Sequence, residues 1–248
     1  MSYLNADVLD AIDTAQFRAQ EPYPWINPQA FIRPERFDDL LHNMPNTTQF
    51  RGFFGKQRKH GQGSHDRYVL DYERGMEIAP QWRDFIEELC DDTYRSLVCR
   101  LLKVKEVRFR FHWHFTPDGG EVTPHCDSKG KIGSQIFYLN TERDWHWDWG
   151  GETVILDDGG RISPDNAPGF EDFDAAYPAQ TRENRSLIFG RRGNSWHGVR
   201  RINCPENHFR KVFIVVFEEH RPVHRAKKRI KRLLTGAPLV TEKERLMY

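Results

Sequence analysis

The sequence lacks several features that define common classes of protein. It has four cysteines, and none of them are spaced as the C-x-x-C pairs of zinc or redox sites. No stretch approaches the roughly eighteen consecutive apolar residues that a membrane helix requires. The start of the chain carries aspartates where a secretory signal needs basic and then apolar residues. We therefore expect a cytoplasmic protein with reduced thiols and no transmembrane segment.

Net charge is also almost absent, since 37 basic and 36 acidic residues give a formal charge of +1. No field of the whole molecule then attracts nucleic acid or anionic lipid, which argues against nucleic acid as a partner. The length suits one domain with a full core, so we expect residues 1–248 to form a single domain. Its expected parts are supporting helices, a strand and a loop in 1–105, a strand-rich core in 106–219 and a basic C-terminal helix or tail in 220–248.

The first part of the chain has the apolar spacing of helices. Residues 80–102 place apolar side chains on one helical face, and Pro80 is suited to begin a helix. A shorter helix is expected at 34–44. Between them, residues 49–75 are polar and rich in glycine, which predicts a long loop. Loops of this length form lids, binding surfaces or mobile insertions.

From Val107 the period changes to two, as in a strand. Polar and aromatic residues alternate from Arg108 to Phe115, which predicts one polar and one apolar face. This alternation explains His112 and His114 without a metal. Further strands are expected at 133–140, 153–156, 186–189 and 211–217. The fold class is therefore mainly β with supporting helices (α+β), built as a double-sheet barrel or jelly roll.

Two H-x-D motifs occur, His125-Cys126-Asp127 and His146-Trp147-Asp148, where chance predicts about one. The first lies between two expected strands. Because residues i and i+2 of a strand project to one side, His125 and Asp127 can hold the same ion. The second lies in an aromatic run that is typical of a connection between strands. With His197, the first motif supplies two imidazoles and a carboxylate, the ligand set of non-haem Fe(II) oxygenases.

Arg210 opens the apolar run that ends the expected core. A guanidinium offers a planar, permanently charged partner for a carboxylate inside a barrel. Arg200 and Arg201 are alternatives to Arg210 as the partner of the carboxylate, because many residues of sequence separate His197 from Arg210. We favour Arg210, since it begins a strand and the alternatives lie in a loop whose charge solvent can satisfy.

Together these fragments resemble the Fe(II)- and 2-oxoglutarate-dependent dioxygenases, in particular their prolyl 4-hydroxylase-like branch. The resemblance extends from about residue 108 to residue 217 and depends on five fragments in the family's order. The fragments are 124–127, 136–140, 150–153, 195–199 and 210–213. The resemblance implies a double-stranded β-helix (jelly-roll or cupin-like) core. It also implies Fe(II) bound by His125, Asp127 and His197, and the distal carboxylate of 2-oxoglutarate bound by Arg210.

The chain departs from the family at Phe137, where members often have a tyrosine that binds the cosubstrate carboxylate. Gln135 or Tyr138 can replace the missing hydroxyl. Strand alternation puts Gln135 on the same face as Phe137, so we favour Gln135 as the second cosubstrate-binding residue.

The resemblance implies a hydroxylase that uses O₂ and 2-oxoglutarate, releases succinate and CO₂, and has ascorbate as a candidate reductant. Its expected substrate is a polar molecule with an aliphatic C–H bond, such as a small metabolite, a sugar or an amino-acid side chain. No catalytic acid or base is needed beyond the metal ligands, because the cofactor supplies the difficult chemistry. Two other classes remain, an oxidative nucleic-acid demethylase on the same fold and a non-enzymatic binding barrel.

A strongly basic segment, Arg221–Arg232, follows the expected core. As a helix it either contacts an anionic surface or packs on the domain with a solvated basic face, and the sequence favours the second interpretation. The substrate itself is not specified. Its selectivity is expected to reside in the 49–75 segment and in residues 157–179.

Overall fold

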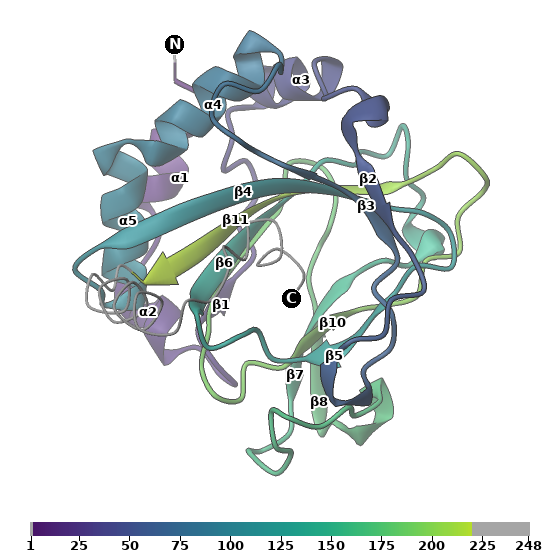
Figure 1. Cartoon of the computed structure of the whole chain (residues 1–248). Helices are drawn as coiled ribbons and strands as arrows, with labels where there is room; N and C mark the ends of the chain where they lie inside the picture. The colour runs from purple at the N-terminus through teal and green to yellow at the C-terminus, as the bar shows by residue number, and fades with distance from the viewer. Residues whose placement is uncertain (1, 220–248) are drawn as a thin grey trace, which may run out of the picture.

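The fold consists of two facing β-sheets with helices on the outer side of the larger sheet (Figure 1). It is seen in a computed structural model that describes residues 2–219. The expected 220–248 tail, including Arg221–Arg232, lies outside the described residues. Within residues 2–219, every helix is too short or too polar to span a membrane.

Five α-helices pack on the larger sheet. They are α1 (Ala6–Asp10), α2 (Thr14–Ala19), α3 (Pro34–His42), α4 (Pro80–Cys90) and α5 (Asp92–Leu102). α3 and α4 both begin at a proline, whose fixed φ suits the first helical position and whose missing N–H is not needed there. Short 3₁₀ turns lie at Thr47–Gln49, Lys59–Gly61, Trp147–Trp149 and Phe170–Asp172.

The larger sheet has seven strands in the order β1-β9-β6-β11-β4-β3-β2. Their bounds are β1 (Trp25–Ile26), β2 (Arg51–Phe53), β3 (Arg67–Asp71), β4 (Val107–Thr116), β6 (Lys131–Tyr138), β9 (Ser186–Gly190) and β11 (Arg210–Glu219). The smaller sheet has the order β5-β10-β7-β8. Its strands are β5 (Val122–His125), β7 (Thr153–Asp157), β8 (Ala175–Pro178) and β10 (His197–Val199). All pairs are antiparallel, and β4 to β11 alternate between the two sheets except at β7 and β8, which are consecutive strands of the smaller sheet, as in a double-stranded β-helix.

Alternation along β4 divides the core into two layers. Its aromatic face packs against the helices, where Trp113 lies 5.1 Å from Trp82 of α4 and 4.9 Å from Phe213 of β11, measured between ring centroids. Full burial of each such side chain contributes roughly 1.5–3 kcal/mol. The opposite face carries His112 and His114 into the space between the sheets, and both are buried. The polar face of the expected strand is therefore the inside of the barrel.

Two expectations for the first half of the chain are corrected. The expected helix at 80–102 is two helices, because Asp91 has extended backbone angles (φ −72°, ψ 163°) between α4 and α5. The expected loop at 49–75 contains β2 and β3, which pair with each other and extend the larger sheet beyond β4. β2 is only three residues long, too short for an alternating pattern to stand out.

Candidate metal and cosubstrate site

His125 and His197 meet where β5 and β10 pair. They are directly opposite in the register of the two strands, and their ring centroids are 4.4 Å apart. Gly198 keeps these strands close: a Cβ at this position would lie 2.8 Å from the carbonyl oxygen of Val122 and 2.7 Å from the ring of Phe170. Glycine after His197 therefore brings the two imidazoles together.

Asp127 lies two residues beyond His125 and completes the cluster. One ligand atom from each of His125, Asp127 and His197 can be chosen so that all three lie within 4.8 Å of one another. Asp127 and His197 are buried, and His125 is partly buried. Among residues 2–219 this is the only such group of three. The arrangement matches the two imidazoles and one carboxylate of a non-haem Fe(II) site, with ligands converging on one point.

Backbone contacts orient both imidazoles. The Nδ1 atom of His125 lies 3.1 Å from the carbonyl oxygen of Thr123, and Nδ1 of His197 lies 3.0 Å from that of Ser195. A carbonyl oxygen only accepts, so Nδ1 carries the proton in each ring and Nε2 keeps a free lone pair. Such contacts from the second nitrogen are the usual support of metal-bound histidines.

The electrostatics keep the three groups in the protonation state that a cation requires. Burial lowers the pKa of His125 and of His197 below the usual histidine value, so both rings stay neutral. Burial alone would raise the pKa of Asp127, but that pKa is lowered instead, and the largest influence in this direction is the Lys131 ammonium, through its charge and its hydrogen bond. The Lys131 ammonium lies 2.7 Å from Oδ1 of Asp127. The carboxylate is therefore held ionised.

Arg210 begins β11 and projects into the barrel. It is only 7% exposed, and its guanidinium donates to the carbonyl oxygen of Gly151 (2.6 Å) and to Oγ1 of Thr153 (2.9 Å). Both contacts are with uncharged oxygens. The alternatives Arg200 and Arg201 are exposed, and Arg200 lies over the ring of Phe170. Arg210 is thus the buried cation of this region.

Tyr138 lies beside Arg210 on the same inner face. It pairs with Val212 on β11, and its ring centroid is 5.5 Å from Cζ of Arg210. Its hydroxyl is buried without a hydrogen-bond partner among residues 2–219, and burial raises the pKa of the phenol to about 12. A neutral hydroxyl and a guanidinium side by side form a receptor for a carboxylate.

Gln135 faces away from Arg210 and Tyr138, so its position does not support the role predicted for it in cosubstrate binding. Its side chain points toward the helices, is fully buried, accepts from the Tyr94 hydroxyl (2.7 Å) and donates to Oγ of Ser186 (3.2 Å). Phe137 points the same way and packs against Phe85 of α4. The opposite face of β6 carries a hydroxyl one residue later, at Tyr138.

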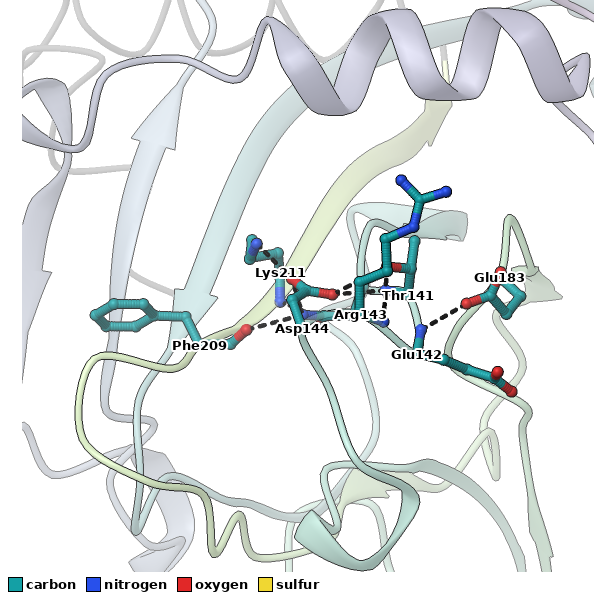
Figure 2. A network of polar contacts seen from close by, with 8 residues as sticks. Thr141, Glu142, Arg143, Asp144, Glu183, Phe209 and Lys211 are labelled. Carbon is teal, nitrogen blue, oxygen red and sulfur yellow. Dashed lines mark hydrogen bonds and ion pairs between the residues drawn. The ribbon is translucent and has the colours of Figure 1, made fainter.

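A polar network fixes the backbone on both sides of Arg210 (Figure 2). The Asn140 amide donates to the carbonyl oxygen of Phe209 (3.0 Å) and to Asp144, while its own oxygen accepts from the backbone N–H of Lys211. The Lys211 ammonium lies 2.6 Å from Asp144. These contacts join the end of β6 to the start of β11, so they position Arg210 against Tyr138.

The competing motif is not a site in the structure. His146 and Asp148 lie in an exposed turn, and each side chain is 54% exposed. His112 and His114 stack inside the barrel with ring centroids 4.6 Å apart, but no Cys, Asp or Glu among the described residues forms a ligand cluster with them.

Comparison with known proteins agrees with this geometry. Residues 110–227 match the family model described as the 2OG-Fe(II) oxygenase superfamily. The match covers just under half of the chain, and it indicates an oxygenase whose cofactors are Fe(II), 2-oxoglutarate and O₂. No curated protein matches the chain.

Several solved structures have a similar fold. A prolyl-4-hydroxylase from Pseudomonas putida is 14% identical, with a TM-score of 0.56 over 84% of this chain and 98% of that chain. A prolyl hydroxylase from Trichoplax adhaerens, in complex with a peptide of hypoxia inducible factor, is 14% identical (TM-score 0.56; 83% and 86%). HygX from Streptomyces hygroscopicus, with nickel, 2-oxoglutarate and hygromycin B bound, is 8% identical (TM-score 0.58; 84% and 88%). The expected double-stranded β-helix fold is confirmed.

Proposed function

We propose that His125, Asp127 and His197 bind Fe(II) in this oxygenase. The observation that carries the proposal is the convergence of their ligand atoms within 4.8 Å, with both imidazoles presenting Nε2. Lys131 occupies one carboxylate oxygen of Asp127 and so leaves the other for the metal. Three protein ligands on one side leave the remaining coordination positions for cosubstrate and oxygen.

The distal carboxylate of 2-oxoglutarate is proposed to bind between Arg210 and Tyr138. Arg210 supplies the charge, and the unpartnered Tyr138 hydroxyl supplies a donor that burial keeps protonated. Thr153, which already contacts Arg210, holds the guanidinium in place. A bound carboxylate would give the Tyr138 hydroxyl the acceptor that it lacks within residues 2–219.

Bound Fe(II) and 2-oxoglutarate supply the oxidising chemistry: one atom of O₂ enters succinate as CO₂ is lost, and the other enters a substrate C–H bond to give a hydroxyl. The protein contributes orientation and a dry pocket. Ile136, Val212 and Phe189 line the barrel as buried apolar groups and exclude water from it. No side-chain acid or base is assigned a role.

The substrate is proposed to be a polar molecule that carries an aliphatic C–H bond. The similar structures include one solved with hygromycin B and one solved with a peptide, so this fold accommodates polar ligands of different size. Polar groups at the open end of this barrel, described below, favour such a ligand over an apolar one.

The test compares Asp127→Ala with Asp148→Ala, the same change in the exposed H-x-D motif. Anaerobic Fe(II) and 2-oxoglutarate should produce a visible charge-transfer band in the wild type and in Asp148→Ala. Asp127→Ala should lose the band and bind Fe(II) at least about a hundredfold more weakly, because loss of a ligand costs more than loss of a supporting contact.

Turnover is followed with the same variants. A pool of metabolites is incubated aerobically with Fe(II) and 2-oxoglutarate, and substrate-dependent succinate is measured with the mass of each component. A component that gains one oxygen atom with the wild type and with Asp148→Ala, but not with Asp127→Ala, is the expected result. A folded wild-type protein that gives neither the band nor succinate would contradict the proposal and would indicate a binding barrel.

A further inference from the structure

The β2–β3 hairpin places its connecting segment, residues 54–66, at the edge of the smaller sheet. Gly63 packs against Thr123 of β5, two residues before His125: a Cβ on this glycine would lie 3.1 Å from the threonine methyl group. His65 contacts His114 of β4 edge to face, with ring centroids 5.7 Å apart. The segment therefore bridges the two sheets beside the proposed metal ligands.

The same segment also contacts the other region expected to determine selectivity. Gln62 donates to the carbonyl oxygen of Asn166 (3.5 Å), and Nε2 of His60 lies 3.6 Å from Asp165. Residues 49–75 and 157–179 thus meet at this side of the barrel. A cavity of about 350 Å³ lies against the segment and is lined by Arg58, Gln62 and Ser64, among others.

Two guanidinium groups of this region have unused donors. NH1 of Arg58 and Nε of Arg67 are buried without a hydrogen-bond partner, and neither arginine takes part in any of the ion pairs formed within residues 2–219. Burial lowers the pKa of both, that of Arg67 to about 10. Buried cations are normally paired, because an unpaired one loses hydration without compensation.

Two further unsatisfied polar atoms lie on the inner faces of the adjoining strands. Nδ1 of His112 on β4 and Oγ1 of Thr123 on β5 are both buried without a partner. Thr123 shares the inner face of β5 with His125, since the two are two residues apart. Of the eight buried side-chain atoms without partners among the described residues, four belong to this cluster and one is the Tyr138 hydroxyl. Such a concentration indicates a missing ligand, because buried polar atoms are rarely left unpaired.

The cluster is close to the proposed metal ligands and separate from the Arg210 pocket. Arg58 lines the same cavity as Gly63, which packs against Thr123, two residues before His125. Arg67 lies on β3, two strands from Arg210 on β11, which corresponds to roughly 10 Å at ordinary strand spacing. A group held at Arg58 and Arg67 would therefore lie next to the metal without displacing 2-oxoglutarate.

We propose that Arg58 and Arg67 bind an oxyanion of the primary substrate, a phosphate or a carboxylate, and hold it beside the metal site. This inference rests on the proposed function in one respect: the molecule that carries the oxyanion is the substrate that the enzyme oxidises. Each guanidinium can donate two parallel hydrogen bonds to such a group. Asp66 and Asp71 also lie near Arg67, but Asp66 accepts from the backbone of Gly55 and Asp71 pairs with Arg51. Both carboxylates act on Arg67 through their charge, but neither forms a hydrogen bond or an ion pair with it within residues 2–219.

The test uses three probes with one carbon skeleton: glycerol 3-phosphate, glycerate and glycerol. Each is titrated calorimetrically into the full-length protein with Fe(II) and saturating 2-oxoglutarate under anaerobic conditions, so that the Arg210 pocket is filled. At least one of the anionic probes should bind, and glycerol should not. The anion that binds more tightly identifies the substrate as a phosphate or a carboxylate.

The variants are Arg58→Gln, Arg67→Gln and, as the matched control, Arg74→Gln. Arg74 lies three residues after the end of β3 and is exposed. Arg58→Gln and Arg67→Gln should each weaken binding of the anion about tenfold or more, the usual consequence of losing a charged hydrogen bond. Arg74→Gln should bind as the wild type does. Arg58→Lys, which keeps the charge, should retain part of the affinity, and thermal melting of each variant shows whether it is folded.

Binding of 2-oxoglutarate is measured first and separates the two proposals. If the wild-type protein does not bind 2-oxoglutarate, the proposed function alone is contradicted. Normal 2-oxoglutarate binding with no affinity for either anion would overturn the oxyanion site alone. Equal binding of glycerol and the anions, or unchanged anion affinity in folded Arg58→Gln and Arg67→Gln, would overturn it as well.

Discussion

Tyr138 and Gln135 are three positions apart on β6, so they project to opposite sides of the sheet. Tyr138 faces the barrel and has a buried hydroxyl without a partner, whereas Gln135 faces the helices and has two partners. The same strand therefore supplies one residue for ligand binding and one for stability.

Replacing Tyr138 by Phe should separate these roles. We expect the dissociation constant of 2-oxoglutarate to rise about tenfold or more, because one hydrogen bond to a charged group is lost. The free energy of unfolding without ligand should change little, since no hydrogen bond of good geometry joins the hydroxyl to its neighbours Arg210 and Thr153. Anaerobic titration and urea unfolding measure the two quantities, and unchanged affinity would refute the assignment of Tyr138.

Gln135→Met should behave in the opposite way. It leaves the Tyr94 hydroxyl and Ser186 without their contacts to Gln135, so the free energy of unfolding should fall by about 1–3 kcal/mol. The affinity for 2-oxoglutarate should stay as in the wild type. A selective loss of 2-oxoglutarate affinity in this variant would restore the original sequence prediction.

The residues that converge in the site could be identified from the sequence, but the face of the strand on which each one lies could not always be identified. His125, Asp127 and Arg210 can be recognised in the sequence because few neighbouring residues have a side chain with the same chemical properties. β6 is different, because residues 134–138 are buried on both sides of the sheet. A strand with two buried faces has no alternation of polar and apolar residues to set its phase. An error of one residue then exchanges every side chain between the faces.

At the scale of elements, the distance between β5 and β10 decides whether His125 and His197 share an ion. Gly198→Ala should push the strands apart, since the new Cβ would meet the carbonyl oxygen of Val122 at 2.8 Å. We expect Fe(II) affinity to fall at least about tenfold, the size of effect seen when metal ligands lose their supporting contacts. Metal titration of the variant measures the change.

Gly193→Ala is the matched control for this change. Gly193 lies in the connection between β9 and β10, and a Cβ there would meet no atom within 4 Å. Its metal affinity should equal that of the wild type. If Gly198→Ala also binds Fe(II) normally, the close approach of the two strands is not what positions the imidazoles.

The longer elements were mostly predicted, whereas among the short ones the buried, apolar β7 and β9 were predicted. β4 and β11 are each ten residues long. β4 follows the expected period of two, and β11 begins at the expected residue, Arg210. β8 and the first two helices went unrecognised, because four to six residues give too few repeats to separate a pattern from chance. β2 and β3 were hidden for the same reason.

At the scale of the whole molecule, buried histidines should make stability depend on pH. Burial first and the nearby charges of Arg67 and Arg110 next lower the pKa of His65, His112 and His114 well below 6.5. Between their folded values and 6.5 the unfolded chain binds more protons, so stability is full above pH 6.5 and falls as the pH decreases below it. Each histidine contributes up to about 1.4 kcal/mol per pH unit in that range.

Urea unfolding of the metal-free protein at several pH values from 7.5 to 5.5 measures this slope. The double variant His112→Gln, His114→Gln should have a shallower slope than the wild type, because two of the contributing groups are removed. An identical slope would show that these two imidazoles are protonated in the folded protein as readily as in the unfolded chain.

The proposed ligands of the two cofactors belong to different sheets. His125 and His197 lie on β5 and β10 of the smaller sheet, while Tyr138 and Arg210 lie on β6 and β11 of the larger one. A 2-oxoglutarate molecule that reaches from the metal to Arg210 would cross-link the halves of the sandwich. Backbone amides of β8, which carries none of the proposed ligands, should then exchange with deuterated solvent more slowly once 2-oxoglutarate is bound, because opening the sandwich would require its release.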